Sequence, residues 1–289
     1  MLQLERKLSL EKLDSVEHFI IAAQIFAVIW WSVSSLLADS VRLWGDQFDI
    51  FMKLNPLSPY STGGFINPPW AAVILEPFSM FPISVSVYIQ LSIYFIAIAL
   101  IVRKYGGSIL SVVIVLSSFV AFDNAIELNV DWISCIGIIA PVWLGAIFLP
   151  IKPQLPMSYF LTLRLNQIII ATGSIICFSI VVMAIWGFWP NDVAYAIQHN
   201  IAGQWANIAP MYHIPVIMSV FIGITGIVYG MKKGDPVIIM ISWIFFVPYI
   251  KLYSLLVYMA LSSAKWPVAT AIVSILMWII YSIVIITSL

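Results

Sequence analysis

Long apolar runs, separated by short polar or charged breaks, make up most of this chain. A run of roughly 20 apolar residues can cross the hydrocarbon core of a bilayer as an α-helix, and the pattern predicts about eight crossings. Proline, glycine and charged residues fill the breaks, where helices end. The expected spans are Phe19–Leu37, Ile83–Val102, Ile109–Phe122, Leu128–Leu149, Gln167–Phe188, Ile214–Gly230, Pro236–Leu261 and Trp266–Ile286.

Three segments depart from this pattern. Residues 1–16 place leucines among charges, which is typical of an amphipathic segment lying along the membrane surface. Residues 38–82 and 189–213 form two long outer loops, and the first contains a proline-bounded helix, Pro68–Phe81, expected to enter the membrane and return. We therefore expect residues 1–289 to form one all-α domain, a polytopic membrane helix bundle with a re-entrant helix and outer loop helices.

Composition agrees with a membrane protein. The chain is 62% hydrophobic and 9% charged, with a mean hydropathy of +1.05, whereas soluble domains carry about 25% charged residues. A formal net charge of zero argues against nucleic acid as a partner. Cys135 and Cys177 both lie in apolar runs. We expect them to be small buried hydrophobic residues rather than a disulfide or a metal site.

The charges predict the orientation. The first span is too long for a signal-peptide core and is interpreted as an uncleaved anchor, which suits a prokaryotic cytoplasmic membrane with the N-terminus inside. Basic residues between later spans then fall on the inner side, as the positive-inside rule requires. In this interpretation Lys152 is an inner-face anchor far from any outer site, whereas Lys265 lies outside. The other inner basic residues are Arg103, Lys104, Arg164, Lys232 and Lys233.

The segment Ser58–Trp70 reads SPYSTGGFINPPW. Its double proline can begin a helix, since proline at the first helical position gives up a donor that would be unpaired anyway. The adjacent glycines allow a tight turn just before it. A re-entrant segment is tolerated at membrane depth where it is buried in protein or lines a cavity. The segment therefore predicts one wall of an outer pocket; the alternative is a packed turn without a ligand.

Three separated pieces of the chain resemble one family. They are SPYSTGGFINPPWAAVILEPFSMFP from Ser58, the ELNVD of Glu127–Asp131 followed by Lys152–Gln154, and FFVPYIKLYSLLVYMAL at Phe245–Leu261. Their order and spacing are similar to those of the glycosyltransferase-C superfamily, in the alpha-mannosyltransferase-like group that uses polyprenyl-phosphate mannose. The resemblance implies a membrane glycosyltransferase that transfers a sugar, with inversion, from a polyprenyl-phosphate donor to an acceptor at the outer face.

Such a reaction needs a carboxylate to take the acceptor proton. The family's candidate base lies just past the first span, where this chain reads DSVRLWGDQFD. Judged by its distance along the loop from the end of the first span, Asp46 is the first candidate for the base, followed by Asp39 and then Asp49. The sequence predicts no metal ligands and leaves a divalent metal requirement open. The implied partners are the lipid-linked sugar donor and membrane lipid.

The reaction also needs donors or cations around the departing phosphate. Lys251 lies within an apolar run, where an ionisable residue is a functional candidate. The alternative interpretation is that its side chain only extends to the membrane interface to keep its ammonium in water. The same two interpretations, a functional role or extension to the interface, apply to Glu76. The complete set of substrate-binding candidates is Arg42, Lys53, Tyr60, Asn67, Glu127, His199, His213 and Lys251.

Several departures from the family pattern keep a second hypothesis open. The chain is short for the family, Glu-Leu replaces Gly-Gln before Asn129, and Ser254 stands where aspartate is usual. A non-catalytic membrane subunit that scaffolds partner subunits or binds lipid would show such departures. That hypothesis predicts no sugar-sized cavity beside the aspartates. A transporter is disfavoured, because the chain has no convincing internal repeat and few charges inside its apolar runs.

Overall fold

A computed structural model describes residues 15–38, 43–200 and 207–288 of the chain. Within these ranges the regular elements are helices, as the sequence predicts. Four of them are long and apolar enough to cross a membrane, or five if one pair bent by 58° counts as a single span. The larger number of crossings expected from the sequence is not confirmed. The long helices are α2 (Val16–Ala38), α5 (Ile83–Lys104), α10 (Leu165–Trp186) and α13 (Val216–Lys233), and the bent pair is α6 (Ile109–Leu116) with α7 (Phe119–Glu127).

Shorter elements complete the bundle and form most of the loops between the long helices. The α-helices among them are α3 (Gly45–Asp49), α4 (Pro69–Ser79), α8 (Asp131–Ile139), α9 (Val142–Phe148), α11 (Pro190–Asn200), α12 (Pro210–His213), α14 (Pro236–Ser242), α15 (Leu256–Lys265) and α16 (Pro267–Ser288). The 3-10 turns are η1 (Phe51–Lys53), η2 (Pro59–Ser61), η3 (Leu149–Ile151), η4 (Met157–Thr162), η6 (Trp243–Phe246) and η7 (Leu252–Leu255). Nearly all of the amphipathic segment expected at 1–16 lies outside the described residues.

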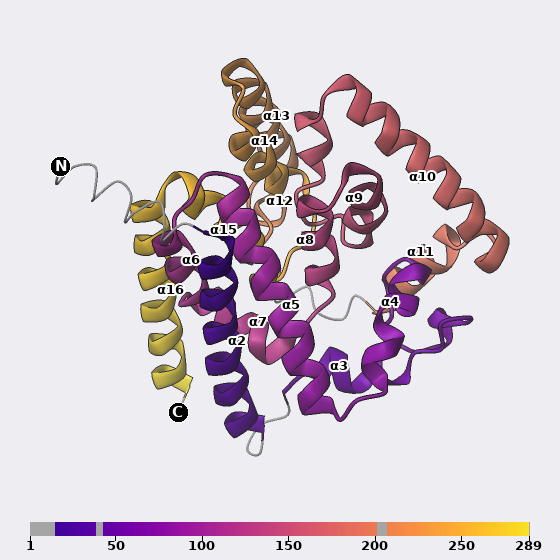
Figure 1. Ribbon diagram of the computed structural model, residues 1–289, viewed down its shortest axis with the longest axis horizontal. Helices are drawn as coiled ribbons and strands as arrows, with labels where there is room; N and C mark the ends of the chain where they lie inside the picture. Colours follow the sequence, from indigo (N-terminus) through magenta and orange to yellow (C-terminus); the bar gives the residue numbers. More distant parts are fainter. Residues whose placement is uncertain (1–14, 39–42, 201–206, 289) are drawn as a thin grey trace.

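Helix α5 is the centre of the bundle. About two thirds of its apolar window, 67%, is buried, against 17% for α2 and 11% for α10. It packs against α2, α8 and α15, and α16 lies beside α2 on the flank of the bundle (Figure 1). Helix α10 runs along the opposite side of the molecule (Figure 1). The bundle therefore has one dense half around α5 and one open half that contains α10 and α13.

The segment Leu128–Leu149 is a helical hairpin, so its prediction as a crossing is wrong. Helix α8 has nine residues, about 14 Å at 1.5 Å per residue, against a hydrocarbon core of about 30 Å. Pro141 ends α8, because the residue before a proline is disfavoured in helical geometry, and Ala140 is extended. The chain then returns, with Ser134 Oγ donating to the Phe148 carbonyl (3.2 Å) and accepting from Lys152 N–H (3.1 Å).

Two glycines allow the arms of this hairpin to touch. A Cβ atom added to Gly145 would lie 2.4 Å from the Gly137 carbonyl oxygen. We therefore expect Gly145→Ala to force α8 and α9 apart and to cost about 1–3 kcal/mol of unfolding free energy. Gly173→Ala is the matched control, since a Cβ there meets nothing within 4 Å and alanine favours α10 by up to about 1 kcal/mol. Thermal unfolding in detergent compares the two; equal melting temperatures would contradict the close approach.

The segment Pro236–Leu261, predicted as one span, is broken in the middle. After α14 and η6 the backbone is extended at Val247 and again at Lys251 before it turns helical at η7. Asn207 satisfies the open backbone, because its Nδ2 donates to Pro248 O (2.8 Å) and its Oδ1 accepts from Ile250 N–H (3.0 Å). Non-helical backbone at membrane depth is tolerated where it lines a cavity, and this segment does so.

Lys265 and Lys233 lie at the same end of the bundle. Lys265 forms an ion pair with Asp235, which follows Lys233 by two residues and caps α14. The prediction that Lys265 lies outside while Lys233 lies inside is therefore wrong. The expectation for the cysteines holds for Cys135, which is buried, but not for Cys177, which is exposed on α10. The outward face of α10 is apolar, so burial could not be inferred from an apolar neighbourhood.

Candidate active site

A cavity of about 810 Å³ lies between the loop before α4, the turn after α9 and the broken segment before α15. Its volume falls within the roughly 300–1,000 Å³ typical of ligand pockets. Residues from six separate parts of the chain line it. They are Asp46, Ile50, Phe51, Gly64, Ile66, Asn67, Pro68, Asn129, Pro150, Ile151, Lys152, Pro153, Gln154, Trp189, Val193, Trp243, Phe246, Val247, Pro248, Tyr249, Lys251 and Tyr253.

Asp46 lies on α3, and the surrounding helices fix that short helix. Trp44, just before it, has a left-handed backbone (φ 56°); its N–H donates to Ile126 O (2.8 Å) and its indole Nε1 donates to Ala125 O (3.0 Å). On the other side, the buried Gln47 donates to Ser86 Oγ (2.9 Å) and accepts from Gln90 Nε2 (2.9 Å). These contacts tie α3 to α7 and to α5, so the Asp46 carboxylate has a defined position.

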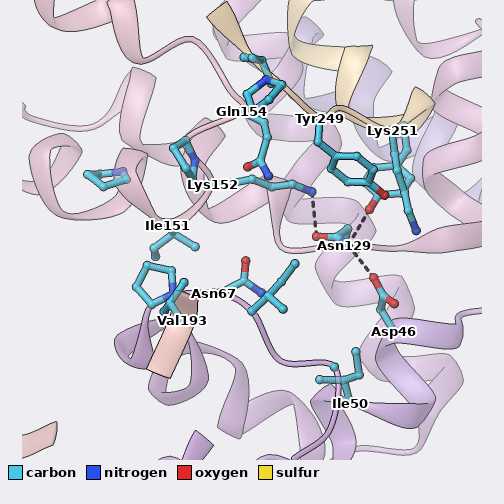
Figure 2. A pocket seen from close by; sticks show the side chains of 18 of the residues that line it. Asp46, Ile50, Asn67, Asn129, Ile151, Lys152, Gln154, Val193, Tyr249 and Lys251 are labelled. Atoms are coloured by element: carbon cyan, nitrogen blue, oxygen red, sulfur yellow. Dashed lines mark hydrogen bonds between the residues drawn. The ribbon is translucent and has the colours of Figure 1, made fainter. Parts of the chain in front are cut away.

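Asn129 joins the polar groups of the cavity. Its Nδ2 donates to Asp46 Oδ2 (2.6 Å) and to Tyr253 Oη (2.8 Å). Its Oδ1 accepts from Lys152 Nζ (3.0 Å) and from Val130 N–H (2.7 Å). Figure 2 shows the side chains of Asp46 and Lys152 reaching Asn129 from opposite sides. One amide group therefore sets the relative positions of a carboxylate, an ammonium and a phenol.

Lys152 is part of this cavity, so its interpretation as an inner-face anchor is wrong. Its ammonium forms an ion pair with Asp131, which is fully buried. Because Asn129 contacts both Asp46 and Lys152, those two residues cannot lie on opposite sides of a bilayer. The hairpin of α8 and α9 is the physical reason, since it returns the chain to the level of Asn129.

Tyr253 lies within reach of both lysines. Lys152 Nζ is 4.7 Å and Lys251 Nζ 5.6 Å from the centroid of its ring, and cations within about 6 Å of an aromatic face are attracted to it. Lys251 comes from the extended backbone after Tyr249, and its ammonium lies toward Asp46 in Figure 2. Two positive charges therefore face the cavity beside one carboxylate.

The electrostatic environment of Asp46 favours its neutral form. Burial raises the pKa of this carboxyl above its ordinary value; Lys251, Lys152 and the Asn129 hydrogen bond oppose that shift but do not cancel it. A carboxylate with a raised pKa is a better proton acceptor than an ordinary aspartate once it is ionised. Asp46 is therefore suited to general-base chemistry.

Much of the remaining cavity lining is apolar and aromatic. Trp189, Trp243 and Phe246 belong to this lining, and Figure 2 shows Val193 and Ile151 on the side away from Asp46 and Lys251. Trp189 lies edge-on to Trp70 (5.3 Å between ring centroids), and Trp243 Nε1 donates to Pro153 O (2.9 Å). The cavity therefore combines charged groups with a large apolar and aromatic lining.

The segment SPYSTGGFINPPW contributes four residues to the cavity wall, Gly64, Ile66, Asn67 and Pro68. Tyr60 lies behind that wall and holds it, because its Oη donates to Asn67 O (3.1 Å). Gly64 has a left-handed backbone (φ 89°), and a Cβ there would lie 2.9 Å from Ile50 Cδ1. Glycine is therefore required at this position, and α4 begins at Pro69, the second residue of the double proline.

Of the residues predicted for the site, the structure brings Asp46, Asn67 and Lys251 together at the cavity. Asp49 and Lys53 form an exposed ion pair (3.8 Å) and do not line it. Glu127, His213 and Glu76 are exposed and do not line it either. Asp39 and Arg42 lie outside the described residues, and so does the side chain of His199.

The predicted set omitted five polar residues of the cavity: Asn129, Lys152, Gln154, Tyr249 and Tyr253. Each belongs to one of the three pieces that carried the family resemblance, and this was the signal that could have found them. The membrane topology expected from the charges had separated Lys152 from Asp46, whereas Asn129 contacts both. Among the described residues, no group of three or more histidine, cysteine, aspartate or glutamate side chains is placed to hold a metal ion.

Comparison with known proteins gives no independent assignment. No family model, curated protein or solved structure matches this chain. Function must therefore be argued from the chemistry of the site.

Proposed function

We propose that this protein is a membrane glycosyltransferase that transfers a sugar from a polyprenyl-phosphate donor to an acceptor hydroxyl. One observation carries the proposal: a carboxylate with a raised pKa and two lysines face a single cavity that is also lined by aromatic side chains. A general base, a cationic phosphate site and a hydrophobic region are the three elements that this reaction needs. The resemblance of three sequence pieces to the glycosyltransferase-C superfamily supports the same reaction.

In the proposed step the acceptor oxygen attacks the anomeric carbon of the donor. Asp46 accepts the acceptor's proton as the new glycosidic C–O bond forms. The bond between the anomeric carbon and the phosphate oxygen breaks, and its electron pair leaves with the lipid phosphate. Lys152 and Lys251 stabilise the charge on that phosphate. Attack opposite the leaving group inverts the configuration at the anomeric carbon.

The non-catalytic alternative predicts no sugar-sized cavity beside the aspartates. The cavity of about 810 Å³ borders Asp46 directly, which supports the enzymatic proposal over the alternative. The surface far from the cavity does not distinguish them, since exposed apolar residues on α10 and α13 suit either lipid or a partner subunit.

A direct assay tests the proposal. The purified protein in nanodiscs is given polyprenyl-phosphate mannose and a short alkyl glycoside acceptor, and lipid phosphate and the new glycoside are measured together. We expect equal amounts of both products, with inverted configuration by NMR. Asp49→Asn is the control, because Asp49 lies outside the cavity and its ion pair is exposed. If the unsubstituted protein makes no product with any polyprenyl-phosphate hexose, the transferase proposal is wrong.

The raised pKa of Asp46 predicts a pH dependence. Transfer requires the ionised carboxylate, and burial shifts its pKa upward from 3.8. The rate should therefore fall on acidification at a pH above that of an ordinary aspartate. The measurement is kcat/KM for the donor between pH 4 and pH 9. A rate that stays level down to pH 4 would contradict the assignment of Asp46 as the base.

A further inference from the structure

Helices α5, α13 and α15 all end in basic residues at the same end of the bundle. Asp235, which follows α13, forms an ion pair with Lys265 at the end of α15. The turn after α5 touches the same part of α15, because a Cβ atom added to Gly107 would lie 2.9 Å from the Ala264 Cα. We call the basic residues at these three helix ends the basic rim; they are Arg103, Lys104, Lys232, Lys233 and Lys265.

Most of the charge of the basic rim is not neutralised by the protein. Within the described ranges, Asp235 is the carboxylate that pairs with a member of the rim, and its partner is Lys265. Arg103, Lys232 and Lys233 are exposed, and none of them forms an ion pair with an acidic residue that the structure describes. The rim therefore presents unpaired positive charge to its surroundings.

Exposed aromatic and apolar side chains adjoin these cations. Lys265 Nζ lies 4.9 Å from the ring centroid of Trp266, and Lys233 Nζ lies 6.0 Å from that of Tyr229. Trp266 is 42% exposed, Tyr229 52% and Val268, two residues beyond Trp266, 72%. Tryptophan and tyrosine favour the level of the lipid headgroups, with apolar residues toward the acyl chains. A free phosphate ion would use the cations and leave the apolar residues in water, whereas a phospholipid matches both.

Helix α5 gives the distance between the basic rim and the cavity. Gln90 of α5 donates to Gln47, the neighbour of Asp46, and α5 ends at Lys104. The helix from Gln90 to Lys104 is about 21 Å long at 1.5 Å per residue, against about 30 Å for the hydrocarbon core of a bilayer. If the rim lies at the headgroups of one leaflet, Asp46 therefore lies within the other leaflet. The rim is thus separate from the cations that line the cavity.

We propose that the basic rim binds the phosphate headgroups of anionic phospholipids in the leaflet that surrounds it, with their acyl chains against the exposed apolar residues beside Trp266 and Tyr229. An anionic leaflet attracts lysine and arginine residues at its surface. Bound headgroups neutralise charge that the protein leaves unpaired, and they hold the rim in the anionic leaflet and the cavity in the opposite one. This binding does not depend on the proposed sugar transfer.

Native mass spectrometry of the purified protein tests this proposal. The protein in detergent is mixed with equal amounts of phosphatidylglycerol and phosphatidylcholine that carry the same acyl chains, and the bound lipids are counted. We expect phosphatidylglycerol to be retained preferentially, and the triple variant Arg103→Gln, Lys232→Gln, Lys233→Gln to lower that preference at least about fivefold. Lys53→Gln is the matched control, because Lys53 is an exposed lysine outside the rim, and it should leave the preference unchanged.

A second measurement needs no variant. Phosphatidylglycerol should raise the melting temperature of the unsubstituted protein more than phosphatidylcholine does, because a ligand of the folded state stabilises it, and added salt should reduce the difference. Equal shifts with the two lipids, or an unchanged lipid preference in the triple variant, would overturn the proposal. Displacement of phosphatidylglycerol by an equal concentration of glycerol phosphate would show a site for soluble phosphate and overturn the assignment to lipid.

Discussion

Asp46→Asn is expected to reduce sugar transfer by about 10²–10⁴-fold, the usual contribution of a general base. Asparagine keeps the shape of the side chain, and its carbonyl oxygen can still accept the hydrogen bond that Asn129 Nδ2 donates over 2.6 Å. It cannot take a proton from the acceptor. The loss should appear in kcat, with the donor's KM nearly unchanged, because both lysines remain.

The same substitution should not destabilise the protein. Burial raises the pKa of Asp46 in the folded state, so the ionised carboxylate disfavours folding at neutral pH. The folded protein therefore loses stability as the pH rises from the pKa of this carboxyl in the unfolded chain to its higher pKa in the folded protein. Asparagine does not titrate, so we expect Asp46→Asn to have an equal or higher melting temperature at pH 7.5 and to lose that advantage near pH 4.

Comparison with Asp49→Asn completes this test. Asp49 differs from Asp46 by three positions and pairs with Lys53 at the surface, so its loss should change transfer less than about twofold, as expected for an exposed pair. Equal loss of activity in both variants would show that α3 is not positioned as described. A fall in melting temperature specific to Asp46→Asn would contradict the burial argument.

Lys152→Met is expected to have the largest effect on stability. Methionine has nearly the same length, but it leaves the Asp131 carboxylate buried without its cationic partner. Removing one partner of a buried ion pair typically costs about 3–5 kcal/mol. The cavity also loses one of its two cations, so transfer should fall together with the melting temperature. Lys53→Met is the matched control, since its ion pair is exposed and worth about 0–1 kcal/mol.

A second variant separates the two effects of Lys152. In Asp131→Leu with Lys152→Met, an apolar pair replaces the ion pair, and such replacements are often neutral or stabilising. We expect the double variant to recover the melting temperature but not the transfer activity, measured in the same nanodisc assay. Recovery of both would mean that Lys152 supports the fold without acting on the donor phosphate. Recovery of neither would mean that Asn129 needs the ammonium to hold its position.

The sequence predicted the local features of the site better than its assembly. The polar segment before α4 predicted a pocket wall, and the double proline begins α4 at Pro69. The choice between Asp46 and Asp49 depends on tertiary structure, because both lie on α3 and only Asp46 lines the cavity. The position of α3 depends on the hydrogen bonds of Trp44 and Gln47 to helices more than 35 residues away in sequence.

One predicted span is a hairpin and another is a discontinuous helix, for related physical reasons. Hydropathy registers the apolar content of Leu128–Leu149 and Pro236–Leu261 but not the direction of the chain. In the first segment Pro141 ends α8, and the contact between Gly137 and Gly145 permits the chain to reverse sharply. In the second, Pro248 lies in an unwound stretch that is stabilised by Asn207, a residue distant in sequence. Both prolines were visible in the sequence. The partners that make a reversal or an unwound segment stable were not, because they are far away along the chain.

By itself, the sequence determined the class of this protein. Runs of apolar residues and the low charge require an all-helical chain in an apolar environment, because a backbone out of water must satisfy its hydrogen bonds within each segment. Tertiary structure alone decided which polar groups meet. Asp46, Asn129, Lys152 and Lys251 come from four separate regions, and their contacts depend on how α3, the α8–α9 hairpin and the unwound segment pack together. Packing of this kind is set by side-chain shape across distant elements, which no local pattern of hydrophobic and polar residues records.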